Sequence, residues 1–497
     1  GRLSARAGGD SRRCKGPSET ALALATRRAC AVSAAGAASA AAGASASALA
    51  PGTLVLGIES SCDDTGAAVV SGDGVVLGEA IASQDAIHER WGGVVPKLAE
   101  EAHAAAIDAV VDEVLGSAGI DAAQLSAVAV TVGPGLSLCL RVGVTKAHRI
   151  AREHGLKVVD VHHMEAHALV ARLTERQKAR EATAEGAAAA DAAVASAAAE
   201  GVAFPFVCLL VSGGHSMFLL AHGIGDYTIL GTSLDDAVGE AFDKTARLLG
   251  LPVGGGGGPA LEKLAAKGDP TAVPFRVPMR QKPTCDLSFA GLKTAVRYAA
   301  DDMLGGGTER NGHSGGERIE WEPSAANEQV RADIAASFQR VAVQHLCDRA
   351  KRALQWARQR EPHVGALVVA GGVAANATLR EGLVAVCDKA SAGLEEPVRL
   401  VCPPPRYCTD NGVMVAWAGV EKLQRGEGRI LPPLEGGTAA EGEGDWVELR
   451  PRWPLGVPHE AATSVKSQKN EWESHMKLSS KDKPEAETQA GAAVASK

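Results

Sequence analysis

The chain has 497 residues, of which 46% are hydrophobic, 22% charged and 3% aromatic, so it can form two or three domains with buried cores. Its formal net charge of −8 argues against a globally basic nucleic-acid-binding protein, but it does not exclude a local basic groove. The ten cysteines include no C-x-x-C pair. We therefore expect buried free thiols in a reducing compartment, rather than a zinc ribbon or a disulfide framework.

Residues 1–50 differ in composition from the rest of the chain. They contain seven basic residues against two acidic ones, in a background of alanine and serine. That composition predicts an organellar transit peptide, and an Ala-rich disordered tail is the alternative. No run of about 18 uncharged apolar residues follows, so we expect no membrane span.

The first half of the chain alternates between strand and helix patterns. Residues 54–58 and 66–70 predict a strand hairpin, and the polar turn between them carries Glu59, Asp63 and Asp64. A helix is expected over 97–115 and a strand over 127–132, which ends at Gly133-Pro134-Gly135. A further helix to residue 150 and a strand over 157–161 lead into the helix of His163 and His167.

The second half repeats this arrangement after an Ala-rich insertion over about 179–201, which we expect to be either a solvated helix or disordered. Strands are expected at 206–211, 217–220 and 366–370, and a long helix over 327–359 follows a Gly- and charge-rich insertion over about 305–324. The last 40 or so residues are polar and predict a disordered tail. The repeated layout predicts a duplicated α/β protein with a cleft between two lobes, towards which the strand-end turns face.

Two imidazoles at i and i+4 suggest a metal site. A helix places His163 and His167 on one face, and Asp410 can complete a His2Asp set that suits Fe, Zn or Mn. His162 points about 100° away from His163, so we take it as a non-ligand. The pair alone is also common as surface decoration. The absence of H-E-x-x-H argues against a metalloprotease.

Several glycine turns suggest a phosphate or nucleotide site. Residues 211–215 run from a strand into Gly213-Gly214, where backbone amides can approach phosphate oxygens. Residues 371–376 end in Asn376, which could bind a ribose or base, or simply start a helix. The run 254–258 is either a nucleotide loop or a linker. Asp63 and Asp64 are either turn formers or groups at the reacting centre.

Six ordered motifs together resemble one family. They are residues 56–65, 162–167, 211–215, 239–244, 370–376 and 408–412, and they resemble the TsaD family of tRNA N6-adenosine threonylcarbamoyltransferases. The resemblance runs from about 54 to 455, and residues 133–140 and 403–405 look like the plant-type organellar branch.

The resemblance implies a fold and its domains. The fold is the actin-like ATPase (ASKHA) duplication, two lobes with a central cleft. The first lobe would comprise 51–162 with 402–455 and the second 163–401, leaving 456–497 as a disordered tail.

The resemblance also implies roles for single residues. One divalent metal ion per subunit, Fe or Zn, would be bound by His163, His167 and Asp410. The nucleotide's phosphate and acyl end would lie along Ser212, Gly213, Gly214 and His215, and its ribose and base on Asp243, Gly258 and Asn376. Asp63 and Asp64 match the acidic pair near the reacting centre, as catalytic residues.

The implied reaction moves threonylcarbamoyl from threonylcarbamoyl-AMP to N6 of the adenosine adjacent to the anticodon in tRNA. A homodimer without membrane attachment is expected, in the mitochondrion or alternatively the plastid. The tRNA would contact Arg141, Lys146, Arg149 and Arg152, unless these are ordinary solvated helix residues. An ATPase or kinase of the same fold and a metalloprotease are the competing readings.

Overall fold

The computed structural model describes residues 49–50, 52–88, 91, 93–184, 201–252, 256–304, 322–432 and 449–462. The predicted transit peptide therefore lies outside the described residues except for its last positions. The same holds for most of both insertions and for the tail beyond residue 462.

The first sheet has six strands in the order β11-β5-β4-β1-β2-β3. Its centre is the parallel pair β1 (Leu54–Glu59) and β4 (Ala127–Gly133), whose apolar runs are almost entirely buried. β2 (Asp64–Ser71) and β3 (Val76–Ser83) add antiparallel strands on one side, and β5 (Lys157–His162) and β11 (Arg429–Ile430) extend the other. The predicted hairpin over 54–70 is present.

The second sheet repeats this plan in the order β10-β9-β6-β7-β8-β12. β6 (Phe206–Val211) pairs antiparallel with β7 (Ser216–Gly223) and parallel with β9 (Ala366–Ala370). β8 (Asp226–Thr232), β10 (Arg399–Val401) and β12 (Val457–Pro458) complete it. The mixed α/β class and the repetition of its halves agree with the sequence analysis.

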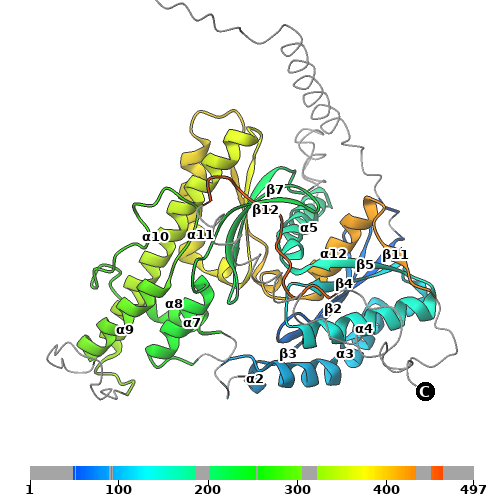
Figure 1. The fold of residues 1–497 in the computed structure, drawn as a ribbon, viewed down its shortest axis with the longest axis horizontal. Helices are drawn as coiled ribbons and strands as arrows, with labels where there is room; N and C mark the ends of the chain where they lie inside the picture. Colours follow the sequence, from blue (N-terminus) through cyan, green and yellow to red (C-terminus); the bar gives the residue numbers. More distant parts are fainter. Residues whose placement is uncertain are drawn as a thin grey trace, which may run out of the picture. The chain divides into compact units, whose positions relative to one another are not determined.

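Helices cover both faces of the first sheet, because alternate strand residues point to opposite sides. Leu56 and Ile58 face α3 (Pro96–Ala118) and α4 (Ser137–His154), whereas Val55 faces α12 (Gly412–Gln424) and α5 (His163–Ala184). Figure 1 shows α3 and α4 running beside each other next to this sheet. The short α2 (Asp85–His88) follows β3.

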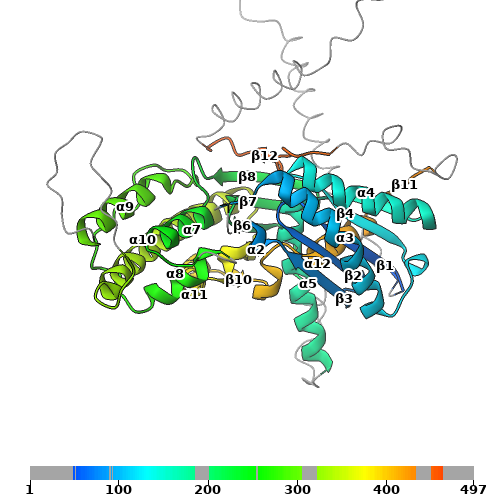
Figure 2. The ribbon, with the colours of Figure 1, turned by 90° about the horizontal axis from the view of Figure 1, so that it is seen from below.

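The second sheet has its largest core on one face. Its residues come from the helices α7 (Val238–Leu248), α8 (Gly257–Ala265), α9 (Ala290–Leu304), α10 (Glu328–Arg360) and α11 (Ala377–Ser391). Figure 2 shows these helices grouped to the left of β6 and β7.

Helix α5 contacts both sheets. Its Leu169 and Leu173 join the core of the first sheet with α12, whereas Met164 and Ala168 join a core with β6 and β7 of the second. The helix that carries the two imidazoles is therefore held from both sides.

Some elements differ from the expectations. β3, β8 and α9 were not predicted. Residues 179–184 continue α5, which agrees with the helical alternative for this part of the insertion. Val457–Pro458 lie in the part predicted to be a disordered tail, and they pair instead with β8. Among the described helices, none has the length and apolar character needed to cross a membrane.

Candidate metal centre and active site

The metal group forms where α5 and α12 begin. β5 ends at His162 and α5 starts at the next residue, so His163 and His167 lie one turn apart with ring centroids 4.7 Å from each other. The Oδ1 atom of Asp410 lies 3.0 Å from His167 Nε2 and 3.7 Å from His163 Nε2. Ligand atoms of all three residues lie within 4.8 Å of one another, so this group could hold a metal ion.

Asp410 owes its position to the close approach of α12 to the first sheet. Asn411 caps the helix, its side-chain oxygen accepting a hydrogen bond from Met414 N at 2.9 Å. A Cβ on Gly57 would lie 2.2 Å from Ala416 N, and one on Gly412 would lie 2.2 Å from the carbonyl carbon of Ala67. Glycine at both positions therefore lets the start of α12 rest on the backbone of β1 and β2.

Glu59 forms a second layer that the sequence analysis did not assign. Its carboxylate is fully buried, accepts from Ser61 N at 2.7 Å and from Thr131 Oγ1 at 2.5 Å, and lies 3.2 Å from His163 Nδ1. Ser61 Oγ also lies 3.2 Å from that nitrogen. Nδ1 of His163 is thus engaged behind the group while Nε2 faces Asp410. This is the usual arrangement of a metal-ligating histidine, so the residues fit a bound cation.

Opposite charges dominate this group. Although burial opposes its protonation, Asp410 and Glu59 raise the pKa of His163 to about 9. Burial would raise the pKa of Asp410, but His163 and His167 hold it well below its usual range. A cation could replace the proton on the imidazole and keep both carboxylates ionised.

Asp63 and Asp64 lie at the start of β2, half-buried near the same centre. Burial raises the pKa of Asp64 to about 7, and the negative charge of Asp410 adds to this effect. Burial also raises the pKa of Asp63. A carboxyl with a pKa near neutrality can take up and release a proton at physiological pH.

The predicted phosphate turn lies beside the metal group. His215 closes it, its N–H donating to Ser212 Oγ at 3.1 Å and its carbonyl accepting from Ser212 N at 2.8 Å. Burial lowers the pKa of His215 to about 4, and positive charge on His163 and His167 acts in the same direction. Gly213 and Gly214 have open space where a Cβ would lie, so their backbone is accessible.

Two further glycines, Gly371 and Gly239, pack directly against the backbone of the turn and leave no room for a Cβ. Gly371 has φ 94°, and a Cβ there would lie 2.4 Å from Val211 O. A Cβ on Gly239 would lie 2.5 Å from Ser212 O, which accepts from Gly239 N at 3.2 Å. Only glycine permits this contact between the turn, β9 and α7.

Of the three other predicted binding residues, Asp243 and Asn376 have structural partners, and Gly258 has open space around it. Asp243 Oδ1 accepts from Gly257 N at 2.7 Å, so it anchors the glycine loop at the start of α8. Asn376 caps α11 by accepting from Leu379 N, and its amide donates to Gln339 Oε1 at 3.0 Å. The helix-start reading of Asn376 is therefore correct, and a ligand role would be additional.

Both ring nitrogens of His162 have hydrogen-bond partners outside the metal group, which agrees with its prediction as a non-ligand. Its Nε2 lies 2.9 Å from the carbonyl of Trp453, and its Nδ1 accepts from Met164 N at 3.1 Å.

The structure contradicts the predicted tRNA patch on α4 at Lys146, one of its four residues. Lys146 is only 9% exposed, and its Nζ lies 2.6 Å from Asp108 Oδ1. Arg149 binds the same oxygen at 2.6 Å. Because one carboxylate pairs with both cations, this part of the helix offers little free positive charge.

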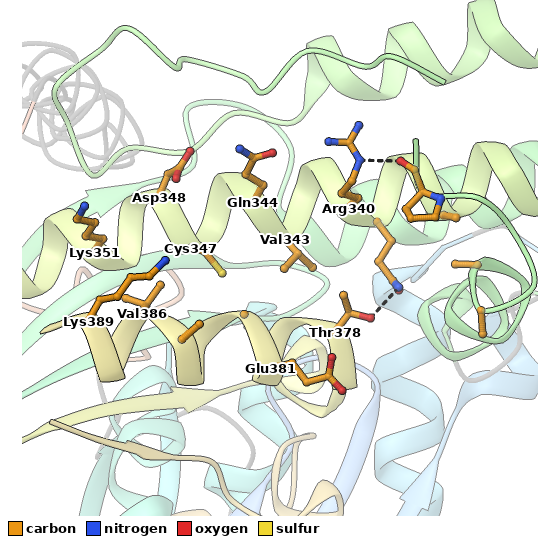
Figure 3. A pocket seen from close by; sticks show the side chains of 17 residues that line it. Arg340, Val343, Gln344, Cys347, Asp348, Lys351, Thr378, Glu381, Val386 and Lys389 are labelled. Atoms are coloured by element: carbon orange, nitrogen blue, oxygen red, sulfur yellow. Dashed lines mark hydrogen bonds between the residues drawn. The ribbon is translucent and has the colours of Figure 1, made fainter. Parts of the chain in front are cut away.

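A groove of about 690 Å³ lies between α10 and α11 (Figure 3). Its lining includes Gln339 and Thr378, which hydrogen-bond to each other at 2.9 Å. No residue of the metal group lines it, so it is separate from that centre.

Comparison with known proteins decides the family. The family profile described as "TsaD: tRNA N6-adenosine threonylcarbamoyltransferase" matches residues 75–182 and 186–417. The chain belongs to the TsaD family. An Arabidopsis thaliana relative named "Probable tRNA N6-adenosine threonylcarbamoyltransferase, mitochondrial" is 48% identical over 408 residues, 81% of this chain and 75% of the relative. An Agrobacterium fabrum relative named "tRNA N6-adenosine threonylcarbamoyltransferase" is 41% identical over 414 residues, which are 82% of this chain and 95% of the relative.

These matches confirm the family and the enzyme class, a transferase, that the motifs predicted. The TsaD motifs at 162–167 and 408–412 are the segments that meet at the metal group, although His167 and Asp410 lie 243 positions apart in the sequence.

Proposed function

We propose that this chain forms N6-threonylcarbamoyladenosine in tRNA, taking the acyl group from threonylcarbamoyl-AMP and placing it on the adenosine adjacent to the anticodon. The observation that supports this best is that the group of His163, His167 and Asp410 lies beside the glycine turn at 213–214. The chain also matches the TsaD family over most of its length.

In this proposal the turn binds the phosphate of the donor. The N–H groups of the exposed residues Gly213 and Gly214 would donate to phosphate oxygens, and they would stabilise the charge that develops as AMP leaves. His215 is held nearly always neutral by its lowered pKa, so it would orient the acyl end by hydrogen bonding rather than by charge.

The metal would be held by His163, His167 and Asp410, one ion per subunit, with Fe and Zn as the candidates. Bound there, it would supply Lewis acidity towards the donor's oxygens. Glu59 and Ser61 would keep the ring of His163 oriented for it.

The bonds made and broken follow from acyl transfer. N6 of adenosine attacks the carbamoyl carbon, the bond from that carbon to the phosphate oxygen breaks, and AMP departs. The nitrogen must lose a proton, and Asp64 is the candidate acceptor because its pKa is raised to about 7. Asp243, Gly258 and Asn376 would contact the ribose and base.

We further propose the finer features that the family resemblance implies: an actin-like duplication with the donor in a cleft between two lobes, a homodimer, and mitochondrial import directed by residues 1–50, with the plastid as the alternative. Deleting residues 1–50 from a fluorescent fusion should leave the protein in the cytosol. Organellar retention of the truncated form would refute the import signal.

The direct test of the activity is the mass of nucleosides from a tRNA digest. Unmodified tRNA incubated with metal-loaded protein and threonylcarbamoyl-AMP should yield N6-threonylcarbamoyladenosine. An ATPase or kinase of the same fold would instead release phosphate from ATP, or transfer it, with tRNA unchanged.

A further inference from the structure

The segment from Pro270 to Cys285, called here the basic segment, is rich in unneutralised positive charge. It contains Arg276, Arg280 and Lys282 and no aspartate or glutamate, in a chain whose net charge is −8. All three side chains are exposed, and none forms an ion pair with a described residue. Nearby lysines behave differently: Lys293 pairs with Asp236, and Lys267 pairs with Glu328.

Three arginines of α10 hold the basic segment in place from behind. Arg349 is 2% exposed and donates to the carbonyls of Lys282 at 2.8 Å and Thr284 at 2.9 Å, and Arg352 donates to the same two carbonyls at 3.0 Å. Arg340 donates to the carbonyl of Pro270 at 2.6 Å, along the dashed line in Figure 3.

These three guanidinium groups add to the positive potential. Each uses backbone carbonyls as its partners, and none forms an ion pair with a carboxylate in the described part of the chain. Asp348 and Asp286 lie close enough to act on Arg349 through space, which reduces the field without cancelling six positive charges. Several carbonyls of the basic segment therefore face the arginines of α10, and its own three basic residues are exposed to solvent.

The basic segment is connected to the phosphate turn through backbone hydrogen bonds. It leads into Leu287, which bridges to Ser233, and Ser233 N donates to the carbonyl of Ser216 at 2.8 Å, one residue after the turn. A Cβ on Gly231 would lie 2.3 Å from the carbonyl carbon of Cys285, so the backbones are in contact there. A polyanion bound along the basic segment would therefore lie against the same substructure that carries the active-site turn.

We infer that the basic segment, backed by the three α10 arginines, is the surface that binds the phosphate backbone of tRNA. This inference rests on the proposed function. A chain of net charge −8 repels RNA overall, so binding requires a local surface where cations are not already paired. The basic segment meets that condition, whereas Lys146 and Arg149 on α4 share Asp108.

The test is the affinity for unmodified tRNA transcript against salt concentration, measured by fluorescence anisotropy on the full chain. The triple variant Arg276→Ala/Arg280→Ala/Lys282→Ala should bind roughly 100-fold more weakly near 0.1 M salt, and its log–log salt slope should fall by about three units, one per lost phosphate contact. Its affinity for threonylcarbamoyl-AMP and its melting temperature should stay at wild-type values.

The matched control removes the same charge elsewhere. The variant Lys97→Ala/Arg141→Ala/Arg149→Ala also loses three exposed cations, from α3 and α4. It should change tRNA affinity by less than about threefold, because long-range charge is screened beyond about 10 Å at 0.1 M salt.

Equal losses in the two triple variants would show that only net charge matters and would overturn the inference, as would unchanged binding in the basic-segment variant. In either case wild-type protein would still modify tRNA. Failure of the wild type itself to modify tRNA would instead reject the proposed function.

Discussion

Replacing either His163 or His167 by alanine is expected to remove the bound metal and nearly all transferase activity while the fold persists. Each imidazole offers one of only three close ligand atoms, and two remaining ligands bind a divalent ion poorly. Metal content by mass spectrometry, with circular dichroism for the fold, measures this. His363→Ala changes an exposed histidine and is the control. Wild-type metal content in both ligand variants would contradict the assignment.

Glu59→Gln is expected to weaken metal affinity by about 10- to 100-fold, because an amide orients the Nδ1–H of His163 less strongly than a carboxylate does. Competition with a fluorescent chelator gives the affinity. Thr131→Val removes a hydroxyl that donates to the same carboxylate and should have a smaller effect in the same direction. An affinity unchanged in Glu59→Gln would mean that the buried carboxylate is only structural.

Asp64 should make the metal-free protein less stable as pH rises. Its pKa is about 7 in the folded protein against an ordinary value of 3.8, so the folded state binds the proton more tightly. The associated stability is present below about pH 4 and is lost as pH rises through 7. Between pH 5 and 8, wild type should therefore lose more in melting temperature than Asp64→Asn. Identical losses would contradict the raised pKa.

The site residues that could be predicted from sequence are those whose relation is local, or those to which the family resemblance assigns a role, as it does for Asp410. His163 and His167 follow from helical spacing, and the Gly213-Gly214 turn follows from a strand that ends there. Glu59 could not be found this way, because its partner His163 is 104 residues away; its only signal was a carboxylate directly after a buried strand. The pairing of Lys146 could not be predicted for the same reason, since its partner Asp108 lies 38 residues before it.

At the level of elements, α5 and α12 are joined by a buried ion pair that should stabilise the fold. Arg172 donates to Glu421 at 2.7 Å, with side-chain exposures of 16% and 2%. It also donates to the carbonyl of Val202 and lies over the ring of Phe204 at 4.4 Å. Arg172 therefore ties the two helices next to the metal group to the segment that leads into β6.

Arg172→Ala should cost about 3 kcal/mol of unfolding free energy, because it leaves Glu421 buried without its partner. Denaturant unfolding of the metal-loaded protein gives this value. The exposed pair of the same helix, Arg180 with Asp73, supplies the control, and Arg180→Ala should cost less than about 1 kcal/mol. Equal costs for the two substitutions would show that the buried pair has no special role.

Long apolar or strongly periodic elements were predictable, as α10 and β4 show. β3 was not predicted because its buried residues alternate with exposed ones, and one of these buried positions is Gly78, which gives no apolar signal. Val457–Pro458 form too short a strand to leave any periodicity. Their pairing with β8 depends on contact with residues more than 200 positions away, which no local pattern encodes.

For the whole molecule, the duplication of strand order explains why distant motifs meet. Each sheet places a hairpin beside parallel strands, β1-β2 in one and β6-β7 in the other, and the turns of both hairpins contribute to the site through residues 59–64 and 212–215. Helix α5, packed against both sheets, carries the imidazoles between them. The proposed acyl transfer requires the two turns and the metal group to act on one donor molecule.

The most direct test of that claim is the ratio of AMP released to adenosine modified, with threonylcarbamoyl-AMP, unmodified tRNA and metal-loaded protein. Acyl transfer at this centre predicts one N6-threonylcarbamoyladenosine for each AMP, and neither product above background in His167→Ala. AMP released without modified tRNA, or modification that persists in His167→Ala, would contradict it.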